Sequence, residues 1–256
     1  SPLQALELLA SSLHGMMTNP STPWFTLKFK DQQVENEDEA KIWLESATDA
    51  MYTAFNRSNF QQEIFELYHD LITFGTAAMF IEEDEEDLIK FSTRHIDEVY
   101  IAENDKGRID TIYRRFKLSA RAIVQKFGDK VSQDILTMEK KDPYQEIEII
   151  HAVYPRSDFD PNKKDKKNMP FESVYMEYKN KNELSVSGFK EFPFVVPRYL
   201  KASHEIYGRS PAMTALPDVK MLNEMSKTTI KAAQKQVDPP LLVPDDGFLL
   251  PVRTVP

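Results

Sequence analysis

Apolar residues recur every three or four positions in several stretches of the chain, a spacing that predicts amphipathic helices. The first predicted helix covers residues 2–17, and a second begins near Asn36 or Asp38. A third follows Ser58, which has the chemistry of an N-cap and precedes a glutamine at the capping-box position. Gly75 suits the left-handed position that closes this third helix.

Alternating apolar and polar residues predict a series of short strands in the middle of the chain. They lie at residues 22–29, 77–81, 88–91, 98–102, 109–118, 146–154, 171–178 and 192–199. The alternation in 146–154 is typical of an edge strand or of one that is covered on a single face. Ser119 is expected to cap a short helix that ends before Gly128. The fold class that follows is α+β, with helices and antiparallel strands in one body.

Six consecutive acidic residues, Glu82–Asp87, separate two of the predicted strands. Because like charges repel, we expect them to form an exposed hairpin tip. An alternative is a metal-dependent hydrolase whose metal site combines Asp84–Asp87 with His95. The run lacks the spacing and the glycine of a calcium-binding loop, which favours the solvated tip.

A long helical pattern begins at Ser210-Pro211, an N-cap followed by proline at the first helical position, and continues to about Val237. Pro217 interrupts this pattern and lacks the N–H that an interior helix residue donates. We therefore expect a kink at Pro217 or a true helix start near Leu216. Asp238-Pro239-Pro240 ends the helix. The extended, proline-rich residues after it predict that the chain continues into a further element.

Four lysines of this predicted helix fall on one side of it. Lys220, Lys227, Lys231 and Lys235 are separated by seven, four and four residues, which places them within an arc of roughly 80°. The alternative interpretation is a solvated face on which Glu224 pairs with Lys220 or Lys227. Small and apolar residues gather on another side of the helix: Ala212, Leu216, Val219, Ser226, Ile230, Ala233 and Val237.

The net charge of −9 argues against a chain that binds nucleic acid over its whole surface. Residues 1–200 contain 25 Lys and Arg against 35 Asp and Glu, whereas residues 201–256 contain 7 against 6. A nucleic-acid contact is therefore expected to be local and to lie in the C-terminal part. Another candidate is the basic and aromatic segment Arg114–Lys117, although a half-buried strand with an exposed basic face has the same pattern.

The composition excludes several classes of active site. The chain has no cysteine, which removes disulfides, thiolate nucleophiles and iron–sulfur clusters. Its seven glycines form no glycine-rich phosphate loop. Its five histidines form no HExxH motif and no i,i+4 pair, so we expect neither a bound metal nor a catalytic histidine. No run approaches 18 apolar residues, so no membrane span is expected.

Motifs near both ends of the sequence resemble one known family. The C-terminal motifs are Tyr207-Gly208-Arg209-Ser210-Pro211-Ala212, Leu216-Pro217-Asp218-Val219-Lys220, Leu222-Asn223, Lys231-Ala232-Ala233-Gln234 and Asp238-Pro239-Pro240-Leu241-Leu242-Val243-Pro244. The N-terminal motifs are Leu9–Met17 and Pro23-Trp24-Phe25. Together they are similar to the head-to-tail connecting (portal) protein of short-tailed bacteriophages.

This resemblance implies a subunit of a ring, usually of twelve copies, at one vertex of the phage capsid. It implies a wing domain over residues 1–208, a stem helix over 209–237 and the start of a clip over 238–256. Asp238, Pro239 and Pro240 then form the entry to the clip. A portal subunit is a structural protein rather than an enzyme, and the resemblance implies no cofactor and no metal.

The resemblance also implies partners and a place of action. Double-stranded DNA passes through the channel of the ring, which contacts the terminase, tail adaptors, scaffold and major capsid protein but no membrane. The protein is then expected in the virion, at the capsid vertex, and in the host cytoplasm during assembly. The candidates for the DNA channel are Lys220, Lys227, Lys231 and Lys235, and those for the subunit interface are Leu216, Val219, Ile230 and Ala233.

Overall fold

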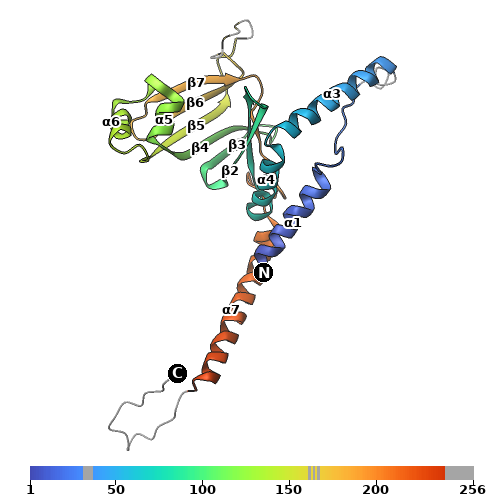
Figure 1. Cartoon of the computed structure of the whole chain (residues 1–256), viewed down its shortest axis with the longest axis vertical. Helices are drawn as coiled ribbons and strands as arrows, with labels where there is room; N and C mark the ends of the chain where they lie inside the picture. The colour runs from blue at the N-terminus through green and yellow to red at the C-terminus, as the bar shows by residue number, and fades with distance from the viewer. Residues whose placement is uncertain (31–36, 161–162, 164, 166–167, 240–256) are drawn as a thin grey trace, which may run out of the picture.

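The computed structural model describes residues 1–30, 37–160, 163, 165 and 168–239 (Figure 1). These residues form an α+β body from which one long helix projects. The helices that open the body are α1 (Pro2–Met17), α3 (Asp38–Arg57) and α4 (Phe60–Phe74), and the projecting helix is α7 (Pro211–Val237). None of the described helices combines the length and the apolar composition needed to cross a lipid bilayer.

The strands form two antiparallel sheets. The smaller sheet has the order β2-β1-β8 and consists of β1 (Ala78–Asp84), β2 (Leu88–Arg94) and β8 (Phe194–Val195). The larger sheet has the order β3-β4-β5-β6-β7 and consists of β3 (Val99–Glu103), β4 (Ile109–Ser119), β5 (Glu146–Pro155), β6 (Phe171–Glu177) and β7 (Glu183–Phe189). Two short helices, α5 (Ala120–Phe127) and α6 (Gln133–Lys141), connect β4 to β5.

Helices cover each sheet with buried apolar side chains. Helix α4 packs on the smaller sheet, where Phe60 and Leu67 meet Met79 and Phe91. Helices α5 and α6 cover one end of the larger sheet. The buried residues there are Phe116, Ala120, Ile123, Val131, Ile135, Ile149 and Leu184. Burying a large apolar side chain stabilises a fold by about 1.5–3 kcal/mol, so these layers fix the body.

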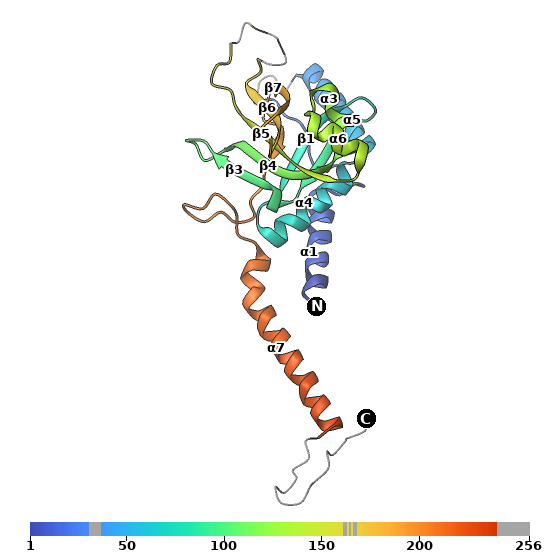
Figure 2. The ribbon, with the colours of Figure 1, turned by 90° about the vertical axis from the view of Figure 1, so that its left-hand side faces the viewer.

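A third cluster joins the two sheets. It brings Phe80 of β1 and Phe194 of β8 against Ile112 of β4 and Val153 of β5. Helix α7 leaves the body next to α4 and extends away from both sheets (Figure 2). Helix α1 also packs on α4, so α4 is the element that supports both.

Several predicted elements are confirmed. The first helix has the predicted bounds, Gly75 closes α4 with φ +78°, and Ser119 caps α5 by accepting a hydrogen bond from the N–H of Ala122 at 3.3 Å. The antiparallel hairpins β1–β2 and β3–β4 and the pairing of β5 with β6 are also present. Local spacing and capping chemistry therefore sufficed for these elements.

The predicted strand at residues 22–29 is wrong, because this segment pairs with side chains instead of a neighbouring strand. The backbone N–H groups of Trp24 and Phe25 donate to the hydroxyl of Tyr52 at 2.6 and 2.7 Å. The N–H of Leu27 lies 3.4 Å from the hydroxyl of Thr48. Both partners belong to α3, which satisfies the extended backbone without a sheet.

The predicted cap at Ser58 is also wrong, because Ser58 closes α3 and Asn59 precedes α4. The side chain of Asn59 makes no capping bond. Its amide instead donates to the carbonyl of Phe91 at 2.8 Å and accepts from the N–H of Phe91 at 3.0 Å. A contact with β2 thus replaces the predicted capping box.

The strands contain further corrections. Strand β5 is the centre of the larger sheet rather than an edge, because both of its neighbours pair along most of its length. Only Phe194–Val195 of the predicted strand 192–199 is a strand, and it pairs with β1. The acidic run is only partly a loop, since β1 extends to Asp84. Strand β7 and helix α6 had no sequence prediction.

Helix α7 is continuous through Pro217 and begins at Pro211. The predicted alternative start near Leu216 is therefore wrong. Ser210 supplies a cap strong enough to begin the helix at Pro211, where a proline loses no helical hydrogen bond. A bend at Pro217 remains a prediction.

Candidate functional site

The head of helix α7 is fixed to the body by Ser210. Its hydroxyl accepts a hydrogen bond from the N–H of Met213 at 2.9 Å, which caps the first turn. The same hydroxyl donates to the carbonyl of Thr73, near the end of α4, at 2.8 Å. Ser210 is buried. One side chain therefore both starts α7 and ties it to α4.

Two glycines bring the segment before α7 against the end of α4. A Cβ atom on Gly75 would lie 2.5 Å from the carbonyl oxygen of Gly208, and one on Gly208 would overlap the carbonyl oxygen of Gly75. The N–H of Gly208 donates to the hydroxyl of the fully buried Thr76 at 2.7 Å. We call this contact of Gly75, Thr76, Gly208 and Ser210 the α4–α7 joint.

Charged and aromatic residues support the joint from the larger sheet. Arg198 and Lys201 both pair with Glu103 at the end of β3. Hydrogen bonds from Lys201 and then from Arg198 lower the pKa of Glu103. The hydroxyl of Tyr207 accepts a hydrogen bond from the N–H of Ile101 at 3.2 Å. The segment that leads into α7 is thus held on two sides before the helix begins.

No residue of α7 is buried against the described part of the body. Its large apolar side chains are exposed: Met213, Leu216, Met221, Leu222, Met225, Ile230 and Val237. Met225 and Ile230 expose 55% and 59% of their surface. So many exposed apolar side chains on one helix are typical of a surface that another protein covers.

The four predicted channel lysines all lie on this exposed part of α7. Lys227 pairs with Glu224 at 3.1 Å, as the solvated-face interpretation predicted. Lys220, Lys231 and Lys235 make no ion pair with any residue that the structure describes. The structure therefore leaves three of the four charges available to a ligand or a partner.

The predicted interface residues share the helix with these lysines. Leu216, Ile230 and Ala233 are exposed and Val219 is half-buried. Asp238 closes the helix and Pro239 follows it, also exposed. Pro240, the third residue of the predicted clip entry, lies outside the described residues.

The basic segment of β4 does not form a stacking platform. Its cations have carboxylate partners at 2.8–3.2 Å: Glu98 for Arg114, Glu148 for Arg115 and Glu146 for Lys117. Phe116 is buried and lies under the guanidinium of Arg114, 3.7 Å from ring centroid to Cζ. Phe116 therefore offers no face to a base, and the exposed aromatic of the same strand, Tyr113, stacks on Tyr154 with 6.3 Å between ring centroids. The half-buried strand is the better interpretation.

The structure separates the two parts of the predicted acidic metal site. Asp84 pairs with Leu88 at the tip of the β1–β2 hairpin, whereas Arg94, just before His95, pairs with Ala78 at the opposite end. Within the residues that the structure describes, no three His, Asp or Glu side chains are arranged to bind a metal ion.

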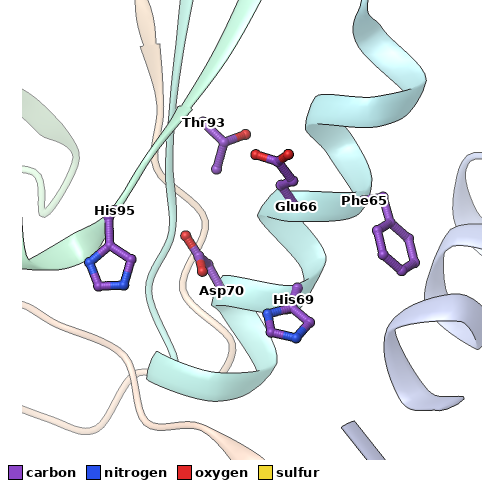
Figure 3. A pocket seen from close by; sticks show the side chains of 6 residues that line it. All are labelled: Phe65, Glu66, His69, Asp70, Thr93 and His95. Atoms are coloured by element: carbon purple, nitrogen blue, oxygen red, sulfur yellow. The ribbon is translucent and has the colours of Figure 1, made fainter. Parts of the chain in front are cut away.

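His95 instead lines a pocket of about 350 Å³ beside α4 (Figure 3). The carboxyl of Asp70 lies between His95 and His69 in this pocket. Burial raises the pKa of Asp70, and the two imidazoles oppose that shift. Nδ1 of His95 lies 2.6 Å from a carboxylate oxygen of Asp97, outside the pocket lining. These partners are acid–imidazole pairs. The hydroxyl in the lining, that of Thr93, donates to the carbonyl of Glu63 at 2.8 Å.

Sequence reasoning missed part of the α4–α7 joint. It identified Gly75 as a helix cap and Gly208 and Ser210 as motif residues, but it did not connect them. Thr76 and Arg198 carried no local signal, because their roles depend on contacts across more than 90 residues. A pair of glycines, one directly after α4 and one shortly before α7, was the available hint.

The comparison with known families decides the identity of this chain. The model of the bacteriophage head to tail connecting protein matches residues 1–256. The chain belongs to this family. It is 36% identical over 245 residues to the portal protein of Salmonella phage epsilon15, covering 94% of this chain and 44% of that protein. It is 32% identical over 257 residues to the probable portal protein of Bordetella phage BPP-1, covering 99% and 46%.

The chain thus spans less than half the length of these two head-to-tail connecting relatives. The family match includes the body, the α4–α7 joint and α7. The joint and the exposed helix therefore lie in the part of the sequence that this family shares.

Proposed function

We propose that the chain is part of a portal subunit, which forms a ring at one vertex of a phage capsid. In this proposal DNA is packaged and ejected through the ring. Helix α7 carries the proposal: it projects from the body, exposes apolar side chains along its length and has three lysines without an ion-pair partner among the described residues. Such a helix is incomplete alone and suits packing between copies of itself.

The lysines of α7 lie between two apolar flanks. One flank contains the predicted interface residues Leu216, Val219, Ile230 and Ala233. The other contains Met221, Leu222 and Met225. The first flank is centred roughly 105° from the lysines around the helix, and the second roughly 130° from them on the other side. If each flank meets a neighbouring helix, the lysines remain uncovered, which suits a channel wall.

The charge of this surface suits a conduit better than a binding site. Helix α7 contributes Lys220, Lys227, Lys231 and Lys235 against Asp218 and Glu224, and the body from which it projects is acidic. Repeated around a ring of twelve copies, a weak positive charge attracts DNA without fixing it at one position. DNA can then slide along the axis.

The proposal assigns parts and partners. Residues 1–208 form the wing, 209–237 the stem helix, and 238–256 the start of the clip, entered through Asp238, Pro239 and Pro240. The ring contacts terminase, tail adaptors, scaffold and major capsid protein, in the virion and, during assembly, in the host cytoplasm. The subunit is structural, and the terminase hydrolyses the ATP.

The first test is negative-stain electron microscopy of the purified full-length protein. We expect rings with a central hole. The second test is the double variant Lys227→Glu and Lys231→Glu, with Lys140→Glu and Lys141→Glu on α6 as the matched change of charge. We expect the α7 variant to form rings and to package or retain less DNA than the α6 variant.

Each unexpected outcome contradicts a different part of the proposal. Uniform small monomers of the unaltered protein contradict the proposal as a whole. Loss of rings in the α7 variant alone assigns these lysines to the subunit interface instead of the channel. Normal packaging by the α7 variant contradicts the channel assignment while leaving the ring in place.

A further inference from the structure

His151 of β5 lies where the two sheets meet. Its side chain is 2% exposed, and its ring stacks on that of Tyr175 with 3.9 Å between centroids and 4° between planes. Its Nε2 lies 2.9 Å from the hydroxyl oxygen of Ser173. From the smaller sheet, Phe80 approaches edge-on at 5.8 Å and Phe194 lies 6.2 Å away. The imidazole therefore belongs to both sheets.

The charged groups that act on His151 are cations from three elements. They are Lys126 of α5, Arg114 of β4 and Arg94 of β2. Burial first, and these cations after it, lower the pKa of His151 from its ordinary 6.5 to about 3.

The carboxylates near this stack act on the cations and not on His151, and Glu98 pairs with Arg114 at 2.8 Å. The ammonium of Lys126 lies 4.6 Å from the centroid of the Tyr175 ring. The ring that stacks on His151 therefore already has a cation–π contact. Glu82 of β1 attracts Lys126. Burial, and after it Glu82, raise the pKa of Tyr175 to about 12, so this phenol stays neutral. In the described part of the chain, His151 has no carboxylate within hydrogen-bond distance.

We propose that His151 is an acid-sensitive joint, which holds the two sheets together while its imidazole is neutral and releases them when it is protonated. Neutral imidazole suits this place, since it fills the space between Tyr175, Phe80 and Phe194 and bonds Ser173. An imidazolium would be a buried charge among three cations, and burial of an uncompensated charge is strongly unfavourable.

The sign of the pH dependence follows from the two states. In the unfolded chain His151 binds a proton near its ordinary pKa, whereas in the folded chain it does so only near pH 3. The unfolded state therefore gains protons first as the pH falls. Stability from this group is full above about pH 6.5 and decreases below it. From pH 7.5 to pH 5 this one group raises the unfolding equilibrium constant about 30-fold.

Urea unfolding of the full chain, followed by circular dichroism from pH 7.5 to pH 5, tests the proposal. The variants are His151→Gln and the double variant His151→Phe with Ser173→Ala, which removes the titrating ring and its polar partner together. The control is His204→Asn, because His204 is exposed with φ +67° and asparagine tolerates that backbone. Each variant is compared with itself across pH, so a lower starting stability does not affect the result.

We expect both His151 variants to lose about 30-fold of the pH dependence of the unaltered chain and the His204 variant to keep it. An unaltered chain whose unfolding constant changes less than about threefold over this range overturns the proposal. So does a folded His151 variant with unchanged pH dependence. If neither His151 variant folds, the pH dependence of the unaltered chain alone tests the proposal, and a change of its unfolding constant below about threefold overturns it.

Discussion

At the α4–α7 joint, the fold requires two residues without side chains, Gly75 and Gly208. Gly75 and Gly208 approach so closely that each backbone occupies the place where a Cβ of the other would stand. The N–H of Gly208 is then free to bond the buried Thr76. Close backbone contact of this kind is rigid, because no rotamer can relax it.

Replacing Gly208 with alanine tests this contact. We expect the variant to lose roughly 1–3 kcal/mol of unfolding free energy, because the new methyl forces the two backbones apart. Gly15→Ala is the matched control: no atom lies within 4 Å of its new Cβ, and it sits inside α1. That change is expected to stabilise the chain by about 0.5–1 kcal/mol. Equal effects of the two substitutions in urea unfolding contradict the role of the joint.

The residues of this joint show where sequence reasoning ends. Ser210 and Gly75 could be assigned because caps depend on neighbours within four positions. The partner of Gly208 is Thr76, 132 residues earlier. Nothing in the local sequence of Thr76 differs from that of an ordinary loop threonine.

At the scale of elements, helices were predicted better than strands. A helix satisfies its own backbone, so its pattern is complete within the segment. A strand needs a partner, and the extended residues 22–29 found side chains of α3 instead. In strand β8 the opposite happens: a segment of only two residues forms a strand because β1 lies beside it as a partner.

The hairpin tip between β1 and β2 allows a prediction about its acidic run. Changing Glu83, Glu85 and Glu86 to glutamine is expected to alter the free energy of unfolding by less than about 1 kcal/mol, because these carboxylates are solvated and repel one another. Asp84 differs, since its carboxylate accepts from the N–H groups of Glu86 and Asp87 at 3.1 and 3.0 Å.

The single variant Asp84→Ala is therefore the control for the tip. It is expected to cost about 1 kcal/mol, the usual value of such a side-chain bond to the backbone. Urea unfolding of both variants gives the comparison. A triple glutamine variant that fails to fold, or an Asp84 variant without any effect, would show that the turn is held in another way.

At the scale of the whole molecule, the body and α7 differ in how they are stabilised. The body has buried clusters on both sheets, whereas α7 is anchored by its first turn and is exposed beyond it. The sequence predicted an α+β body followed by a long helix. It did not predict which sheet each strand joins, because register across a sheet depends on contacts far apart in the chain.

This difference predicts a pattern of proteolysis. In unassembled chains, trypsin is expected to cut first after the exposed lysines of α7, including Lys227 and Lys231, because opening an unpacked helix costs little free energy. Lys117, on the paired strand β4, is expected to resist. Mass spectrometry of the early fragments gives the order of cleavage. In assembled rings the α7 sites are expected to become protected, and equal cleavage with and without assembly contradicts the packing of α7 between copies.

The anchoring of α7 at one end makes it a lever. Its 27 residues extend about 40 Å at 1.5 Å per residue. A rotation of about 5° at the α4–α7 joint would therefore move the far end by roughly 3–4 Å. In a closed ring every copy would turn together, and the bore at the far ends would widen or narrow by about twice that displacement. In the proposed ring, the close approach of two glycines would then set the diameter of an opening about 40 Å away.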